Sequence, residues 1–289
     1  MNTSFADIEK KENRKDLIIS ICVFLSGFSC FAQLYYFQPL LPDLAKDFIL
    51  SASESSFAIS FSTLGMVFGL FTTMFVADRI PRKKMIGTGL LSSSIFSVAA
   101  SFSPTFLPLI LLSAAKGFLL SGATSVSMAY IAEEVSSRNK GKIMGLYIAG
   151  NALGGMAGRV ISSWIGALYT WRIASVSIGL ICALFAILFL LFSPRSTNFM
   201  PRKESFHTLI IANLQLITSK ALIPFYLTGG LILGVFVSLY NYLGFYLTKA
   251  PFNFPEHYIH YIYLMYIFGI FGSIATAGLT RYLDRKSVV

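Results

Sequence analysis

Residues 145–159 read GLYIAGNALGGMAGR, a run in which glycine recurs at every fourth position. Gly150, Gly154 and Gly158 fall on one face of a helix, because residues four apart lie about one turn apart. In a soluble helix each glycine would cost about 1 kcal/mol relative to alanine. Between membrane helices, small residues at this spacing let two backbones approach closely. The run therefore predicts a helix that packs tightly inside a membrane bundle, and Gly155 widens the strip.

The composition of the whole chain agrees with a lipid environment. Of its 289 residues, 55% are hydrophobic and 12% are charged, and the mean hydropathy is +0.69. An average soluble domain has about 25% charged residues, so this composition excludes an ordinary soluble protein, a disordered chain and a nucleic-acid binder. The net charge of +10 comes from short Lys and Arg clusters between apolar runs, as in membrane proteins. Cys22, Cys30 and Cys182 lie inside apolar runs, so we expect no disulfide framework, metal site or cofactor.

Eight apolar stretches are long enough to cross a hydrocarbon core of about 30 Å, which needs about 20 helical residues. They cover approximately residues 17–41, 55–76, 85–102, 106–132, 143–169, 171–192, 222–247 and 258–279. The pattern predicts an all-α multi-pass membrane protein with a tail (1–16), a six-helix part (17–192), a linker (193–221) and two further helices (222–289). Residues 206–217 of the linker form either a short amphipathic helix on the membrane or an irregular segment.

The distribution of Lys and Arg predicts the orientation. With the N-terminus in the cytoplasm, the inner segments hold 18 of the 23 basic residues and the outer loops hold only Lys46, Arg172 and Lys249. Such a bias sets the topology of membrane proteins. We therefore expect both termini in the cytoplasm.

A faint repeat relates the two parts of the chain. Asp78 and Arg79 end the second span, and Asp284 and Arg285 end the eighth. Transporters built from two six-helix halves carry parallel repeats of this kind. The repeat favours a C-terminally shortened version of a twelve-helix protein.

Several motifs resemble the major facilitator superfamily. Residues 74–83 read MFVADRIPRK and resemble the family's G-x-x-x-D-R-x-G-R-K motif, with Met74 and Pro81 in place of the glycines. The glycine-rich run is similar to the fifth-helix motif of the drug–proton antiporter branch. Its core, Gly150 to Arg159, and the sequence Gln38-Pro39 resemble YnfM-type transporters of bacterial inner membranes. The resemblance implies the superfamily's fold and proton-coupled efflux.

The same resemblance implies roles for the two motifs. Asp78, Arg79, Arg82 and Lys83 would form a charged latch that holds one access state, and the helix that completes this latch in the family lies in the second half. Glu133 and Glu134, at the inner end of the fourth span, are expected within reach of Arg82. An Asp at a helix C-terminus needs a cationic partner, and Arg82 lies four residues after Asp78. The alternative is a solvated basic loop. The glycine face would lie at the boundary between the halves, or would serve only tight packing.

Two charges fall inside the predicted spans. Lys116 lies near the middle of the fourth span, and Arg159 lies toward the outer end of the fifth. Because such charges are costly in a bilayer, they indicate function by default. Lys116 is a candidate for substrate contact or coupling, and its alternative is pairing with a carbonyl or snorkelling along its stem. Arg159 is a candidate for a lock to the outer end of the first span, where Asp43 lies, and its alternative is outward snorkelling. The family's Arg-x-x-Gln-Gly motif reads Ser113-Ala-Ala-Lys116-Gly117 here, without the arginine.

The remaining candidates are polar or aromatic side chains at cavity depth. They are Gln33 and Tyr36 in the first span, Asn151 in the fifth, and Tyr240 and Asn241 in the seventh. Buried amides need hydrogen-bond partners, and a substrate can supply them. The tyrosines could instead belong to an interfacial aromatic belt. No carboxylate or histidine lies near the middle of a predicted span. His260 falls at the very start of the eighth span, and Asp43 at the outer mouth is the carboxylate that comes nearest to the membrane.

These features favour a secondary transporter over an enzyme. We expect it to export a small amphipathic compound in exchange for protons, from the bacterial inner membrane, without nucleic acid or an obligate protein partner. A membrane enzyme or receptor would need an intramembrane carboxylate or histidine. Two other hypotheses remain. The chain is an importer or exporter of a sugar or other metabolite, or it is an inactive fragment of a transporter. We expect residues 1–192 to resist protease and this chain alone not to transport, because transport rocks two complete halves.

Overall fold

The computed structural model describes residues 5–201, 206–255, 258–263 and 265, and its regular structure is helical in all these ranges. Its α-helices are α1 (Phe5–Tyr35), α2 (Leu41–Asp47), α3 (Ala52–Ser55), α4 (Phe57–Val76), α5 (Arg82–Ala100), α6 (Phe106–Glu134), α7 (Lys140–Leu168), α8 (Trp171–Phe192), α9 (Phe206–Ile217), α10 (Ile223–Thr248) and α11 (Ile259–Tyr263). Two 3-10 helices, η1 (Gln38–Leu40) and η2 (Ala77–Arg79), complete the set. The all-α prediction is confirmed.

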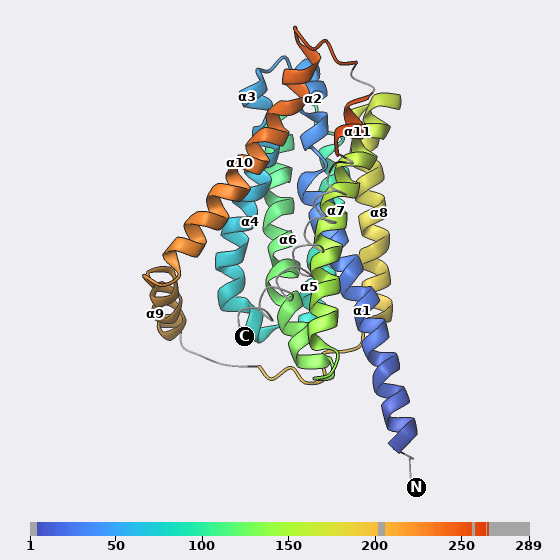
Figure 1. Cartoon of the computed structure of the whole chain (residues 1–289), viewed down its shortest axis with the longest axis vertical. Helices are drawn as coiled ribbons and strands as arrows, with labels where there is room; N and C mark the ends of the chain where they lie inside the picture. The colour runs from blue at the N-terminus through green and yellow to red at the C-terminus, as the bar shows by residue number, and fades with distance from the viewer. Residues whose placement is uncertain (1–4, 202–205, 256–257, 264, 266–289) are drawn as a thin grey trace, which may run out of the picture.

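The long helices form one bundle whose axes run roughly along its length (Figure 1). In it α4 packs on α6, α1 packs on α7 and α8, and α5 lies against both α6 and α8. In the described part of the chain, five segments are long and apolar enough to span a membrane: residues 12–47, 52–79, 106–134, 171–192 and 223–248. α5 and α7 belong to the same bundle, and the predicted eighth span lies outside the described residues from residue 266 on.

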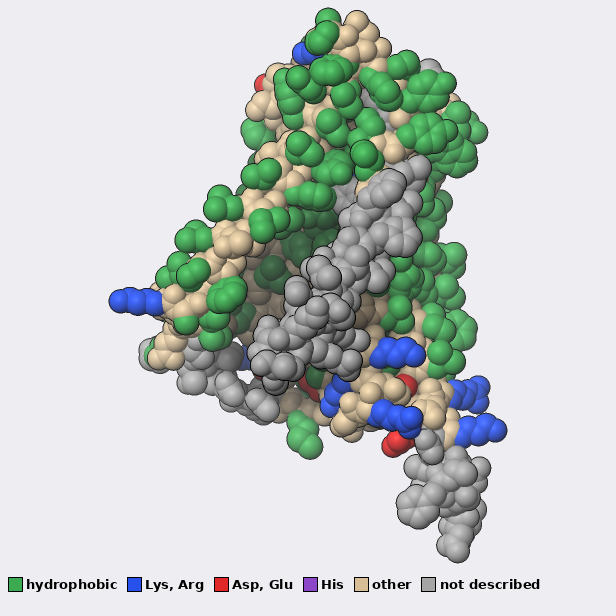
Figure 2. Space-filling view, viewed as in Figure 1, with side chains coloured by type: hydrophobic (Ala, Val, Ile, Leu, Met, Phe, Trp, Pro, Cys, Tyr) green, Lys and Arg blue, Asp and Glu red, His purple; other side chains and the backbone are tan. Residues whose placement is uncertain are grey.

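Two buried hydrophobic clusters form the core of the six-helix part. One contains Ile19, Ile86 and Leu120, and the other contains Leu40, Leu109 and Ile178. Several helices contribute to each cluster, because each helix buries only one stripe of its surface. The remaining apolar side chains face outward over much of the visible surface, while Lys and Arg gather mainly at the end where α1 begins (Figure 2).

α10 packs less closely on the bundle than helices α1 to α8 do. It contacts η1 and α2 at one end of the bundle and leans away from the bundle toward its other end (Figure 1). Gly244 is its only buried residue. α9 connects to it and is seen nearly end-on, so it lies across the bundle axis. The helical alternative for residues 206–217 is therefore the observed one.

Candidate functional site

The segment after α1 organises the candidate site. α1 ends at Tyr35, and the chain then forms the short helix η1, with Pro39 in its first turn. Proline has no N–H to donate and restricts the residue before it, so a regular helix does not continue here. The side chains of residues 35–38 contact two buried cations, Lys116 and Arg159. Tyr35 and Gln38 contact Arg159, whereas Tyr36 and Phe37 contact Lys116.

Lys116 lies in the interior of the six-helix part. Its side chain is on α6 and is 1% exposed, and its Nζ lies 4.5 Å from the ring centre of Tyr36 and 4.9 Å from that of Phe37. Nζ has no hydrogen-bond partner among the described residues, and neither does Ser113 Oγ, one turn earlier. A desolvated cation–π contact contributes about 2 kcal/mol, whereas burying an ion costs several kcal/mol. The two rings therefore compensate this ammonium only in part.

Arg159 lies on the other side of the same segment. It is 1% exposed, donates from Nη1 to Gly155 O at 2.7 Å, and donates from Nε to Gln38 Oε1. Its guanidinium carbon lies 4.2 Å from the ring centre of Tyr35 and 5.8 Å from that of Tyr240. α1, η1, α7 and α10 therefore meet around one buried cation.

Gln38 links Arg159 to α10. Its Nε2 donates to Asn241 Oδ1 at 2.7 Å while its Oε1 accepts from Arg159. Nearby, a Cβ added to Gly244 would lie 3.2 Å from Pro42 Cγ, so the backbones of α10 and the α2 region are close together. Asn241 and Tyr240 thus belong to the contact between α10 and the six-helix part. Gln38 makes this contact through its two hydrogen bonds, and its sequence position predicts a polar group at cavity depth at the end of the first span.

The amides of Gln33 and Asn151 are placed differently from each other. Gln33 is fully buried, donates to Ser29 Oγ at 3.3 Å and accepts from Ser97 Oγ at 3.2 Å. Its hydrogen bonds are therefore made within the six-helix part. Asn151 is half-buried on α7, and its Oδ1 has no hydrogen-bond partner in the part of the chain that the structure describes.

The charged loop between α4 and α5 forms a compact cluster with α6. Arg82 Nη2 lies 2.9 Å from Asp78 Oδ1 and 3.0 Å from Glu133 Oε1. Its Nη1 donates to Ala77 O at 2.7 Å, which caps a carbonyl at the end of α4. Arg82 therefore joins the ends of α4 and α6, while Arg79 is exposed.

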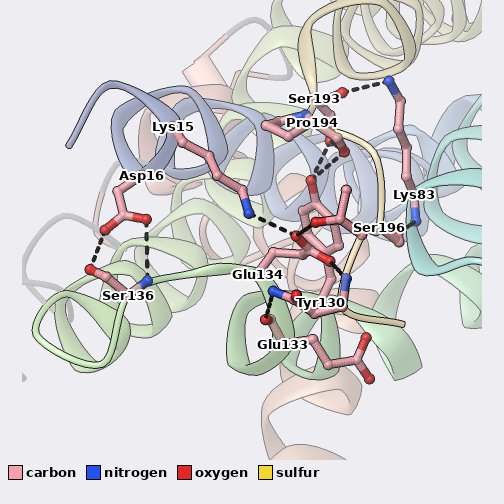
Figure 3. Close-up of polar contacts among 12 residues, drawn as sticks. Lys15, Asp16, Lys83, Tyr130, Glu133, Glu134, Ser136, Ser193, Pro194 and Ser196 are labelled. Atoms are coloured by element: carbon pink, nitrogen blue, oxygen red, sulfur yellow. Dashed lines mark hydrogen bonds and ion pairs between the residues drawn. The ribbon is translucent and has the colours of Figure 1, made fainter. Parts of the chain in front are cut away.

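The linker after α8 runs along the same end of the bundle (Figure 1), and Figure 3 shows the polar contacts that hold it there. Lys83 Nζ donates to Ser193 O, and the Lys83 N–H donates to Ser196 Oγ at 3.0 Å. Glu134 accepts from Lys15 Nζ at 2.8 Å. It also accepts from Thr197 Oγ1 and from the Asn198 N–H, at 2.9 and 2.7 Å respectively. Lys83 and Glu134 thus fasten the linker rather than join the Arg82 cluster.

Comparison with known proteins identifies the family. The sequence matches the model of the Major Facilitator Superfamily over residues 20–288. The chain belongs to the major facilitator superfamily. Members of this family are membrane transporters, not enzymes.

Relatives and solved structures agree with this assignment. The chain is 35% identical over 245 residues to an uncharacterized transporter of Buchnera aphidicola subsp. Schizaphis graminum, covering 85% of this chain and 59% of the relative. It is 35% identical over 236 residues to the inner membrane transport protein YnfM of Escherichia coli K12, covering 81% and 56%. A bacterial homolog of the human lysosomal transporter Spinster, solved inward-facing and unoccupied, shares the fold, with a TM-score of 0.76 at 14% identity over 94% of this chain and 64% of that one. The chain thus spans less than three fifths of these two relatives.

In this superfamily member the glycine face of α7 packs on α1. A Cβ at Gly150 would lie 2.5 Å from Phe24 O, one at Gly154 would lie 2.1 Å from Phe28 O, and one at Gly158 would lie 2.7 Å from Ala32 O. Contacts this short leave no room for a side chain. The face therefore lies within the six-helix part and not at a boundary with α10. Gly155 borders this face more loosely, since its Cβ would lie 3.3 Å from Arg159 Nη1 and 3.8 Å from Tyr35 Cδ2 of α1.

Proposed function

We propose that this chain belongs to a secondary transporter that exports a small amphipathic compound in exchange for protons. The observation that carries the proposal is the unequal contact between α10 and the six-helix part. Gln38, Asn241, Pro42 and Gly244 bring them together at one end, whereas α10 leans away toward the other end, where Arg82 holds its cluster. Alternating access needs contacts that can form at one end while the other end is open.

The 18-to-3 distribution of basic residues supports an orientation in which the end carrying the Arg82 cluster faces the cytoplasm. Gln38 and Asn241 then lie toward the outside, so the contact between α10 and the six-helix part is at the outer end. We place the protein in the inner membrane of a bacterium with both termini in the cytoplasm.

Fusions of alkaline phosphatase test this orientation, because the enzyme is active only outside the cytoplasm. We expect a fusion after Val289 to be inactive and a fusion after Lys249, in an outer loop, to be active. β-galactosidase fusions at the same two positions should show the opposite pattern and control for expression. Phosphatase activity after Val289 would contradict the even number of spans.

Proton exchange is tested by following pH inside proteoliposomes with a trapped dye. Because the chain covers 56% of YnfM, the protein used is this chain joined to the final helices of that relative, called here the extended chain. Benzoate, ethidium and glucose are added separately, as an anion, a cation and a neutral sugar. We expect an amphipathic ion, but not glucose, to change the internal pH beyond the change seen in protein-free liposomes, into which neutral benzoic acid diffuses unaided. A response to glucose alone would favour the sugar-transport alternative, and no response to any of the three would contradict proton exchange.

A further inference from the structure

Two buried donors without partners lie on one face of α6. Ser113 and Lys116 are three residues apart and so lie on the same side of the helix. They are 0% and 1% exposed, and neither Ser113 Oγ nor Lys116 Nζ has a hydrogen-bond partner among the described residues. Buried polar groups are nearly always hydrogen-bonded, and an exception calls for a missing ligand, ion or water. Two such groups on one turn point to a single missing acceptor.

The surroundings define what kind of acceptor fits. The rings of Tyr36 and Phe37 face Nζ, and the Tyr36 hydroxyl is already engaged with Ser175 Oγ at 2.9 Å. Within the described ranges, the buried acids are Asp16 and Glu134, and both have other partners. Asp16 is bound by Ser136 and Asn139, and Glu134 is bound by Lys15 and the linker. A ligand here would therefore meet one positive charge, one hydroxyl donor and two aromatic faces. A carboxylate attached to an aromatic or apolar body matches all of these.

We propose that Ser113 and Lys116 form a subsite for the carboxylate of an amphipathic, aromatic substrate. This inference rests on the proposed transport function and names its substrate class. Tyr36 and Phe37 cover the subsite from the turn between α1 and η1, so the substrate reaches it when that turn moves. Because residues 35 and 38 of the same turn contact Arg159, movement of the turn would also change the Gln38 contact with α10. Substrate binding and closure against α10 are thereby linked.

The test is ligand-induced stabilisation of the purified 289-residue chain in detergent, which requires no transport. Benzoate is compared with benzamide, which has the same shape without the charge, and with chloride. A ligand that binds only the folded state raises the melting temperature. We expect benzoate to raise it by about 3 °C or more at saturation, and benzamide and chloride to have no comparable effect.

Variants assign this effect to the subsite. Lys116→Met and Lys116→Gln should each weaken benzoate binding about tenfold or more, and Ser113→Ala should weaken it severalfold, since a hydrogen bond to a charged group is stronger than a neutral one. Lys142→Met, which changes an exposed lysine on α7, should bind as the parent does. Size-exclusion chromatography identifies folded variants, and the glutamine variant serves if methionine prevents folding.

Three outcomes would overturn the subsite: equal stabilisation by benzamide, equal stabilisation by chloride, or undiminished benzoate binding by the folded Lys116 variants. Stabilisation by chloride would show an inorganic anion site instead. This binding experiment and the proton measurement can fail separately. If benzoate does not bind, the carboxylate subsite is wrong, but proton-coupled export of another substrate is still possible. If benzoate binds but no protons move, the subsite is supported and proton exchange is wrong.

Discussion

Gly154→Ala should destabilise the folded chain more than any other single methyl group added to α7. The new Cβ would lie 2.1 Å from Phe28 O and 2.5 Å from Phe28 Cα, which are backbone atoms and cannot rotate away. α1 and α7 would have to separate. Overpacking typically costs 1–3 kcal/mol, and we expect about 3 kcal/mol here. The melting temperature in detergent should fall by about 10 °C.

Gly145→Ala is the matched control. Gly145 lies on the same helix, and a Cβ added there would have no neighbour within 4 Å. Alanine is the better helix former by about 1 kcal/mol, so this variant should be as stable as the parent or slightly more stable. Equal melting temperatures for the two variants would show that α7 does not pack on α1 as described.

Arg82→Gln should uncouple the ends of α4 and α6. The substitution leaves Asp78 and Glu133 without their shared cation and removes the hydrogen bond to Ala77 O. Loss of a buried ion-pair partner costs 3–5 kcal/mol. Because the two carboxylates are 41% and 26% exposed, we expect about 1–2 kcal/mol of lost stability. If the cluster holds one access state, proton-driven export by the extended chain should fall about tenfold.

Arg79→Gln and a double-mutant cycle isolate this effect. Arg79 belongs to the same motif but is exposed, so its loss should change both melting temperature and export little. Glu133→Gln combined with Arg82→Gln should cost less than the sum of the single changes, because the two residues contact each other. Additive effects would mean that the contact carries no coupling energy. Equal effects at residues 79 and 82 would leave the motif as a basic loop that sets topology.

The sequence predicted the helices better than the directions of their side chains. Hydrophobic length and loop charge marked the helices, and the spacing of Asp78 and Arg82 anticipated a contact that the structure contains. The same reasoning put Glu133 and Glu134 together near Arg82, yet adjacent residues on a helix point about 100° apart. Glu134 accordingly turns to Lys15 and the linker.

The side chains that surround Lys116 and Arg159 could not be predicted, because they come from the turn that follows α1. Depth in a span can be estimated from residue counts at 1.5 Å per residue, and both residues are indeed buried. Which partners they meet depends on how the chain turns after Tyr35, and that follows from tertiary packing. Hydrophobic periodicity does not predict the path of this turn. The contact between Arg159 and Gln38 and the contact between Lys116 and Phe37 therefore could not be predicted from the sequence. Helix rotation similarly determined that the glycine face meets α1.

The most direct test of this account measures accumulation of radiolabelled benzoate in inside-out vesicles under an imposed proton gradient. Vesicles containing the 289-residue chain are compared with vesicles containing the extended chain, and a protonophore serves as the control in both. We predict accumulation by the extended chain that the protonophore abolishes, and none by the shorter chain, because alternating access needs two complete halves. Gradient-driven accumulation by the 289-residue chain alone, or none by the extended chain, would contradict the account.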